Sequence, residues 1–309
     1  MEWQPFRVQV PASSSNLGPG FDTLSLAFGL HLIVDVSPRQ APGVEWPSDW
    51  TLPLSENILD RAISAAFKAL DFDPPGLRLG IENPIPLRRG LGSSGAAIIA
   101  GIKIAEEITG TRLSNKQILE IAYPLEGHPD NLTASLLGGW VLSWVSDGEV
   151  DALRLLESLS CQFVVLIPEP TVATPKARAI LPDSYSLGEA VFNLQRCALL
   201  VHALQTGQKA LLKEATRDRL HQEYRARLVP GLTALLNWEG IEDDWSSSLL
   251  ATFISGSGSA VVALVEDNEE DIGRWMVQTL ARQGTAAHYR VLELDSVGAR
   301  IQHGIVNYK

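Results

Sequence analysis

The hydrophobic positions of the chain follow two kinds of pattern. Short runs rich in β-branched residues predict strands at Phe6–Val10, His31–Val36, Leu77–Ile81, Gly139–Val145, Phe163–Ile167, Ala260–Val265 and Tyr289–Leu294. Longer runs with helical periodicity predict helices at Asn57–Leu70, Ala96–Thr109, Ser114–Leu125, Leu187–Thr206 and Asp271–Gln283. Because strands and helices do not alternate strictly, the pattern favours an α+β fold over a doubly wound parallel sheet.

The length of the chain suits two domains. It has 309 residues, and single domains usually have roughly 100–200. The polar, acidic stretch Ser146–Leu159 separates two apolar strands and is the predicted joint between the domains. We therefore place one domain at residues 1–155 and a second at residues 156–309.

Charge and composition exclude several classes of function. The formal net charge is -11 and no run of Lys and Arg exceeds a pair, so we expect no nucleic-acid partner. No apolar run reaches the ~18 residues that a membrane span needs. The chain has two cysteines, Cys161 and Cys197, and its first residues lack a signal-peptide pattern, so we expect a reducing, cytoplasmic location.

A glycine-rich stretch, RRGLGSSGAA at residues 88–97, reads GxGxxG. A dinucleotide fingerprint needs a buried strand just before it, and Pro84 and Pro86 stand there instead. What remains is a flexible loop in front of an apolar helix, with Ser93 and Ser94 as possible caps, and the free N–H groups of such a helix bind anions. A tightly packed helix start without any ligand is the other interpretation of this stretch.

Four stretches together resemble one known family. Residues 84–97, PIPLRRGLGSSGAA, resemble the phosphate-binding motif of the GHMP small-molecule kinases. VPASSSNLGPGFDTLSLAFGL at residues 10–30 and EGHPDNLTASLLGG at residues 126–139 resemble the homoserine kinase forms of two further motifs. FISGSGSAVVALV at residues 253–265 resembles the glycine-rich third motif of the family. Gly95 departs from the usual alanine, DNLTAS from DNVAPA, and SGSGSAV from SGAGPT.

The resemblance implies a fold and an activity. It implies the two-domain GHMP kinase architecture, with an N-terminal domain like the second domain of ribosomal protein S5 and a ferredoxin-like C-terminal domain. It also implies transfer of the ATP γ-phosphate, with Mg²⁺, to the side-chain hydroxyl of L-homoserine in threonine biosynthesis. A homodimer is usual in that family, although no feature of the sequence itself indicates one.

The resemblance assigns the nucleotide and metal sites. ATP binding falls to Pro86, Leu87, Arg88, Arg89, Gly90, Leu91, Gly92, Ser93, Ser94, Gly95 and Ala96. Mg²⁺ prefers oxygen ligands, and the family likeness points to the Ser94 hydroxyl with a nearby glutamate. Glu120 is preferred because it precedes Asn131 by eleven residues, a spacing like that of the family, and Glu126 beside the EGHPDN motif is the alternative.

The resemblance also assigns the acceptor site, which must hold a zwitterion. The planar fork of arginine suits a carboxylate, and this role falls to Arg178 and Arg225. Asp22 and Asn16 would hold the ammonium group.

The chemistry falls to residues beside the acceptor hydroxyl. Asn131 and His128 would lie next to it, with Thr174 as a helper, so Asn131, Thr174 and Arg178 are the catalytic candidates. The resemblance gives no general base, because asparagine stands where some family members carry aspartate. Since phosphoryl transfer has a loose transition state, we expect catalysis chiefly by positioning and electrostatics.

Three other functions stay open at this point. A GHMP kinase for another small alcohol would leave the charge pattern of Asp22, Arg178 and Arg225 unmatched. A nicotinamide dehydrogenase would need the glycine loop to bind pyrophosphate. A binding protein without catalysis would have lost Ser94, Arg178 or Asn131, and all three are present.

Overall fold

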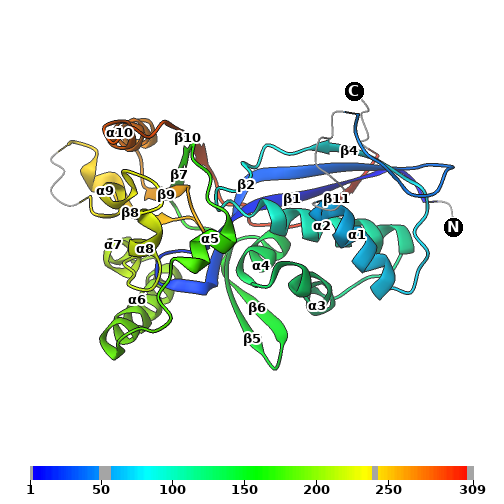
Figure 1. The fold of residues 1–309 in the computed structure, drawn as a ribbon, viewed down its shortest axis with the longest axis horizontal. Coiled ribbons are helices and arrows are strands. Elements are labelled where there is room, and N and C mark those ends of the chain that lie inside the picture. The colour runs from blue at the N-terminus through cyan, green and yellow to red at the C-terminus, as the bar shows by residue number, and fades with distance from the viewer. Residues whose placement is uncertain (1–2, 49–56, 239–242, 305–309) are drawn as a thin grey trace.

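The computed structural model describes residues 3–48, 57–238 and 243–304. Within them the chain forms two sheets, each covered by helices, in an elongated molecule (Figure 1). The strands are β1 (Phe6–Asn16), β2 (Gly20–Pro38), β3 (Val44–Glu45), β4 (Leu77–Glu82), β5 (Trp140–Ser146), β6 (Glu149–Leu156), β7 (Gln162–Pro168), β8 (Leu249–Ile254), β9 (Val261–Val265), β10 (Ala287–Leu292) and β11 (Arg300–His303). The helices are α1 (Ile58–Ala69), α2 (Ser93–Thr109), α3 (Asn115–Glu126), α4 (Asp130–Leu137), α5 (Thr174–Ala179), α6 (Leu187–Thr206), α7 (Leu212–Ala215), α8 (Gln222–Ala226), α9 (Leu232–Leu236) and α10 (Glu269–Ala281). The predicted α+β class is confirmed.

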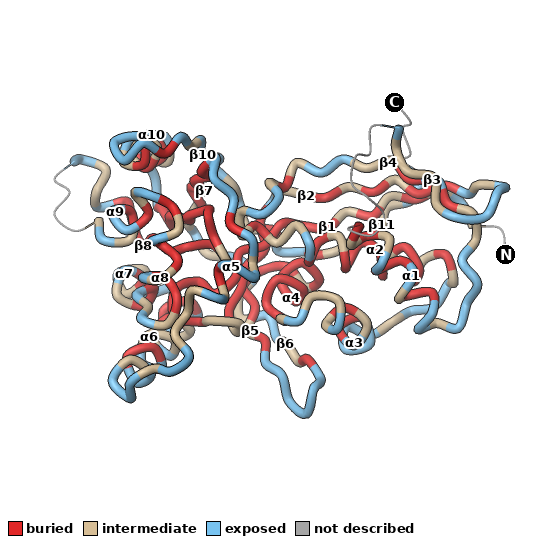
Figure 2. The backbone as a smooth tube through the Cα atoms, viewed as in Figure 1, coloured by how far each residue is buried: buried red, intermediate tan, exposed pale blue. Residues whose placement is uncertain are grey.

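The first sheet is built on the long pair β1 and β2. Its strand order is β11-β1-β2-β4-β3, with β5 paired to β2 and β6 to β5. In β1 the side chains alternate, so that Phe6, Val8 and Val10 are buried and the residues between them are less so. α2 packs between this sheet and α1, and its apolar residues are buried on all sides, as the sequence predicts for an internal helix (Figure 2).

The second sheet has the order β10-β7-β9-β8 and all its pairs are antiparallel. β7 and β9 are central strands, and their runs FVVLI and VVALV are buried on both faces. α10 packs against β7 and β10 through Ile272, Met276 and Leu280. This sheet and its helices form the left half of Figure 1.

The stretch predicted as the domain joint is part of the first sheet. Ser146–Leu159 contains β6, which forms a hairpin with β5 that projects from the molecule (Figure 1). The chain crosses to the second sheet between Leu156 and Gln162. β11 returns from the far end of the chain to pair with β1. The division at residues 155 and 156 stays a prediction, since the first sheet draws on both ends of the chain.

No helix in the described part of the chain is long and apolar enough to cross a membrane.

Candidate active site

A cavity of about 370 Å³ lies where the two halves of the molecule meet. The end of β1, the turn into β2, the glycine loop, the start of α4, helix α5 and helix α8 all contribute to its wall. Every residue predicted for the acceptor site lines it: Asn16, Asp22, His128, Asn131, Thr174, Arg178 and Arg225. The fold therefore brings together residues that are up to 209 positions apart, as the difference between 225 and 16 gives.

Most of the predicted ATP loop also lines the cavity. The lining residues are Pro86, Leu87, Arg88, Gly90, Leu91, Gly92, Ser93 and Ser94. Arg89 turns away and donates from Nε to the Pro168 carbonyl at 2.8 Å and from NH2 to the Glu169 carbonyl at 2.7 Å. Gly95 and Ala96 are buried in the first turns of α2. These three predicted residues support the loop and are not part of the cavity wall.

The N-terminus of α2 is open toward a ligand. The N-cap is Gly92, with φ 69°, and no side chain caps the helix. The prediction that Ser93 or Ser94 caps the helix is wrong, because both lie inside its first turn. The uncapped N–H groups and the positive end of the helix dipole favour an anion such as a phosphate.

Close packing requires glycine at two positions of the loop. A Cβ on Gly90 would lie 2.0 Å from the Ser255 carbonyl oxygen, and one on Gly92 would lie 1.9 Å from Ser13 Oγ. At Gly95, where the family usually has alanine, a Cβ would lie 3.2 Å from the Asn131 Cβ. The departure at Gly95 thus accompanies a close approach of α4 to α2.

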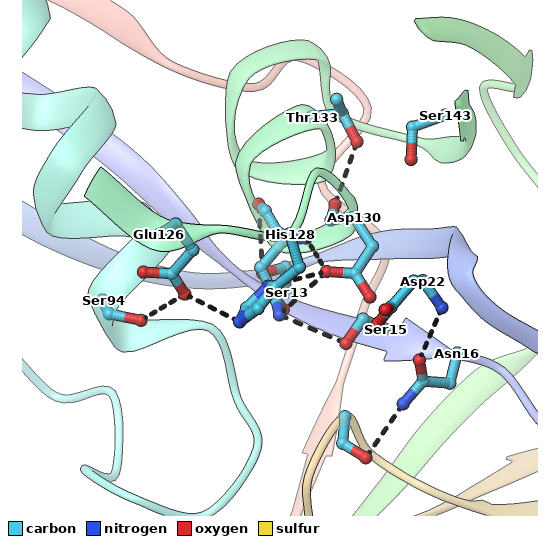
Figure 3. A network of polar contacts seen from close by, with 12 residues as sticks. Ser13, Ser15, Asn16, Asp22, Ser94, Glu126, His128, Asp130, Thr133 and Ser143 are labelled. Carbon is cyan, nitrogen blue, oxygen red and sulfur yellow. Dashed lines mark hydrogen bonds and ion pairs between the residues drawn. The ribbon is translucent and has the colours of Figure 1, made fainter. Parts of the chain in front are cut away.

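Ser94, Glu126, His128 and Asp130 form a chain of polar contacts (Figure 3). Ser94 Oγ donates to Glu126 Oε1 at 2.7 Å, and His128 Nε2 lies 3.6 Å from the same oxygen. His128 Nδ1 lies 3.3 Å from Asp130 Oδ1. Burial raises the pKa of Glu126. Burial alone would lower the pKa of His128, but Asp130 and Glu126 together raise it above its ordinary value.

Of the two predicted metal ligands, the geometry favours the alternative, Glu126, over Glu120. Glu120 is exposed on α3 and does not line the cavity, whereas Glu126 lies at the C-terminal end of α3 and does. The helix ends there, so Glu126 projects toward the start of α2. A short loop separates α3 from α4, so Glu120 and Asn131, eleven residues apart, lie on different helices.

The side-chain amide of Asn131 is held by the end of β1. Ser13 Oγ donates to Asn131 Oδ1 at 2.9 Å, and Asn131 Nδ2 donates to Ser15 Oγ at 3.2 Å. Asn131 is 8% exposed and both serines are buried. Because both ends of the amide have a partner, the orientation of Asn131 is fixed before any ligand binds.

Asp22 and Arg178 form a bidentate ion pair across the cavity. Arg178 donates from NH2 to Asp22 Oδ1 at 2.7 Å and from NH1 to Oδ2 at 3.0 Å. Hydrogen bonding to Asp22 raises the pKa of Arg178. Asn16 accepts from the Asp22 backbone N–H at 3.1 Å and donates to the Gly256 carbonyl at 3.0 Å. Asn16 and Asp22 have φ values of 72° and 54°, a conformation that Asn and Asp adopt more readily than most residues.

Arg225 is a buried cation without a carboxylate partner in the described chain. It is 3% exposed, and its NH1 donates to the Gly256 carbonyl at 2.8 Å and its Nε to the Ala177 carbonyl at 3.3 Å. Burial, and then the charge of Arg178, lower its pKa to about 10. A cation held in a cavity wall by neutral carbonyls is well suited to an anionic ligand.

Asn57 is a cavity residue that sequence reasoning missed. It is 2% exposed, and its Oδ1 caps α1 by accepting from the Leu59 and Asp60 N–H groups. Its Nδ2 has no partner within the described residues, although it is buried and Asn57 lines the cavity. Asparagine is common at helix N-caps, so nothing in the sequence indicated a second role for Asn57.

Comparison with known proteins places these features in a family. The chain matches the GHMP kinases N terminal domain over residues 57–139 and the GHMP kinases C terminal domain over residues 200–275. A homoserine kinase from Streptomyces coelicolor is 43% identical over 304 residues, which cover 96% of this chain and 94% of that protein. A homoserine kinase from Desulfitobacterium hafniense is 39% identical over 299 residues, or 96% and 99% of the two chains.

Solved structures confirm the two-domain GHMP kinase architecture. The crystal structure of homoserine kinase from Cytophaga hutchinsonii has a TM-score of 0.83 at 24% identity and covers 98% of both chains. A putative homoserine kinase from Listeria monocytogenes has a TM-score of 0.75 at 27% identity, covering 97% of this chain and all of that one. The chain therefore belongs to the homoserine kinase family of the GHMP kinases, which are ATP-dependent enzymes.

Proposed function

We propose that this chain transfers the γ-phosphate of ATP to the side-chain hydroxyl of L-homoserine, giving O-phospho-L-homoserine in threonine biosynthesis. Two relatives, 39% and 43% identical, are homoserine kinases, and the match extends over nearly their whole length. The assignment of homoserine as the substrate rests on the charged side chains of the cavity wall. Besides Arg88, Glu126 and Asp130, the wall carries the carboxylate of Asp22 and the guanidinium groups of Arg178 and Arg225, and Asp22 pairs with Arg178.

The acceptor site matches an amino acid zwitterion. The carboxylate of homoserine binds between Arg178 and Arg225, and its ammonium group binds Asp22. Asn16 holds the turn that carries Asp22, and its Oδ1 retains a lone pair for the ammonium group. The ion pair of Asp22 and Arg178 then opens to admit the substrate, whose two charges replace the partners that each residue gives up.

ATP binds with its phosphates at the start of α2. The uncapped N–H groups of α2 and the backbone of the loop from Gly90 to Ser94 approach the phosphate oxygens. Asn57 Nδ2, which is buried and has no partner among the described residues, donates to an acceptor on the nucleotide. The cap that Asn57 provides to α1 fixes its side chain for this contact.

Ser94 and Glu126 fit a magnesium ion. Both are oxygen donors, which Mg²⁺ prefers, and one or two protein groups usually suffice because phosphates and water supply the rest. The Glu126 carboxylate is buried and its pKa is raised, so a nearby divalent cation would stabilise its ionised form. Bound there, Mg²⁺ would offset the charge of the phosphates.

The phosphoryl transfer itself depends chiefly on the position of the acceptor hydroxyl relative to the γ-phosphate. Asn131, fixed by Ser13 and Ser15, holds the acceptor hydroxyl in line with the γ-phosphate, with His128 and Thr174 beside it. The hydroxyl proton leaves late, to a phosphate oxygen or to water, because the loose transition state needs no strong base. The positive end of the α2 dipole stabilises the charge on the transferred group.

A coupled ADP-release assay tests the proposal. L-homoserine, L-serine, mevalonate and galactose are compared with wild type, Arg178→Ala and the control Arg274→Ala. Arg274 is exposed on α10 and pairs with Asp271, away from the cavity. We expect turnover of L-homoserine alone, reduced by about 100-fold or more in Arg178→Ala and unchanged in Arg274→Ala. Turnover of mevalonate or galactose in place of homoserine would overturn the substrate assignment.

The proposal extends to a cytoplasmic homodimer, on the family resemblance. Cys161 and Cys197 are free thiols, as a reducing compartment allows. Light scattering checks the assembly: a mass near twice 33.6 kDa supports the dimer, and a monomer mass removes it.

A further inference from the structure

His221 is a fully buried histidine just outside the acceptor site. It is 0% exposed and stands at the N-cap position of α8, four residues before Arg225. It is not among the residues that line the cavity. Its ring nevertheless contacts two of the elements that do.

The contacts of the ring fix its tautomer. His221 Nε2 lies 2.8 Å from the Gly18 carbonyl oxygen, which is an acceptor only, so Nε2 carries the proton. His221 Nδ1 lies 3.4 Å from Arg225 NH1, which is a donor only, so Nδ1 accepts. A neutral imidazole satisfies both contacts and an imidazolium satisfies one.

The charges around the ring oppose one another, and burial is what favours a neutral ring. Asp218 Oδ2 lies 3.9 Å from His221 Nε2, but it already accepts from the His221 and Gln222 N–H groups. Asp218 and, near the start of β2, Asp22 favour a positive ring, Arg225 on α8 repels one, and the Phe21 ring packs 5.4 Å away. Burial is the largest effect and lowers the pKa of His221.

We propose that His221, as the neutral Nε2–H tautomer, is a positioning residue that orients the acceptor site. It links Arg225 to the turn between Asn16, at the end of β1, and Asp22, near the start of β2. The assignment rests on the proposed function, since it presumes that this site binds the homoserine zwitterion. Through Nδ1 His221 orients the Arg225 guanidinium, whose NH1 also donates to the Gly256 carbonyl. Through Nε2 it holds Gly18, two residues beyond Asn16.

The turn between β1 and β2 is also held by Thr216 and Asn193. A Cβ on Gly18 would lie 2.2 Å from the Thr216 carbonyl oxygen, so the turn lies directly against the segment before α8. Asn193 donates to the Pro19 carbonyl at 3.3 Å and to Asp218 Oδ1 at 2.8 Å. The His221 bonds therefore connect a turn that is already held in place with the guanidinium of Arg225, a residue of the cavity wall.

Two variants separate positioning from packing. His221→Leu fills the space without hydrogen bonds, and His221→Gln keeps an N–H donor that can reach the Gly18 carbonyl. We expect His221→Leu to raise KM for L-homoserine by about 10- to 100-fold while KM for ATP changes by less than about twofold, and His221→Gln to restore part of the loss. Thermal melting and ATP titration of each variant measure how much folded protein is present.

The outcomes are distinct. If wild type turns over homoserine and His221→Leu leaves KM for homoserine unchanged, or if the Gln and Leu variants behave alike, the positioning role is overturned. If wild type does not use homoserine, the proposed function and this assignment fall together. Imidazole ¹⁵N NMR gives a readout without turnover: we expect the neutral Nε2–H tautomer at about pH 8, and an Nδ1–H or charged ring at that pH would overturn the assignment.

Discussion

At the residue scale, the polar residues of the cavity divide into those whose partners are complete and those that await a ligand. Asn131 has a partner on both sides of its amide. Asn57 Nδ2 is buried and has no partner in the part of the chain that the structure describes, and Arg225 is a buried cation held by carbonyls. Leaving such groups unsatisfied costs free energy, which binding can recover. The buried polar groups that lack a full set of partners therefore indicate where atoms of a ligand bind.

Asn57 offers a direct test of this argument. Asn57→Ser keeps an oxygen that can cap α1 but removes the unpaired Nδ2 donor. We expect KM for ATP to rise by about 2- to 10-fold, the worth of one hydrogen bond, with little change in KM for homoserine. Asn57→Ala, which also loses the cap, should melt at a lower temperature. An unchanged KM for ATP in Asn57→Ser would show that Nδ2 does not contact the nucleotide.

The metal assignment is tested with a matched pair of variants. Glu126→Gln removes the carboxylate that accepts from Ser94, and Glu120→Gln makes the same change at an exposed position of the same helix. We expect the Mg²⁺ concentration for half-maximal activity to rise by about 10- to 100-fold in Glu126→Gln and to stay the same in Glu120→Gln. The reverse result would restore Glu120 as the ligand.

At the element scale, periodic segments were predicted well and the polar segments of the site were not. The helix predicted at Leu187–Thr206 is found with those bounds, and that predicted at Ala96–Thr109 begins three residues earlier. The end of β1 and all of α4 were not predicted as regular structure. Several of their residues, such as Ser13, Ser15 and Asn131, are polar although they are buried. These residues interrupt the alternation of hydrophobic and polar positions from which strands and helices are predicted.

The start of α2 gives a prediction with an internal control. Gly92 and Gly110 flank α2 with the same φ of 69°, but a Cβ on Gly92 would lie 1.9 Å from Ser13 Oγ and one on Gly110 meets nothing within 4 Å. Gly110→Ala should therefore cost about 1–2 kcal/mol of unfolding free energy and leave kcat intact. Gly92→Ala should cost more and lower kcat, because it displaces Ser13 and with it Asn131. Equal effects in denaturant melts and in kcat would contradict the role given to the loop.

At the scale of the whole molecule, the site exists because distant segments meet. Asp22 and Arg178 are 156 positions apart in the chain and pair directly. The family motifs predicted that these residues act together, but no local pattern could predict the pairing of β11 with β1 or the place of β6 in the first sheet. Such pairings depend on contacts between remote segments, and each segment taken alone has no preference among them.

Whether the cavity recognises both charges of an amino acid can be measured by comparing kcat/KM for L-homoserine, 4-hydroxybutyrate and 3-aminopropan-1-ol with wild-type protein. The two analogues keep the acceptor hydroxyl, but the first lacks the ammonium group and the second lacks the carboxylate. If Asp22 faces the one and Arg178 with Arg225 the other, each analogue leaves a charge of the site unpaired, and we expect kcat/KM to fall by about 100-fold or more for both. Turnover of either analogue at a rate near that of L-homoserine, or no turnover of L-homoserine, would contradict the account.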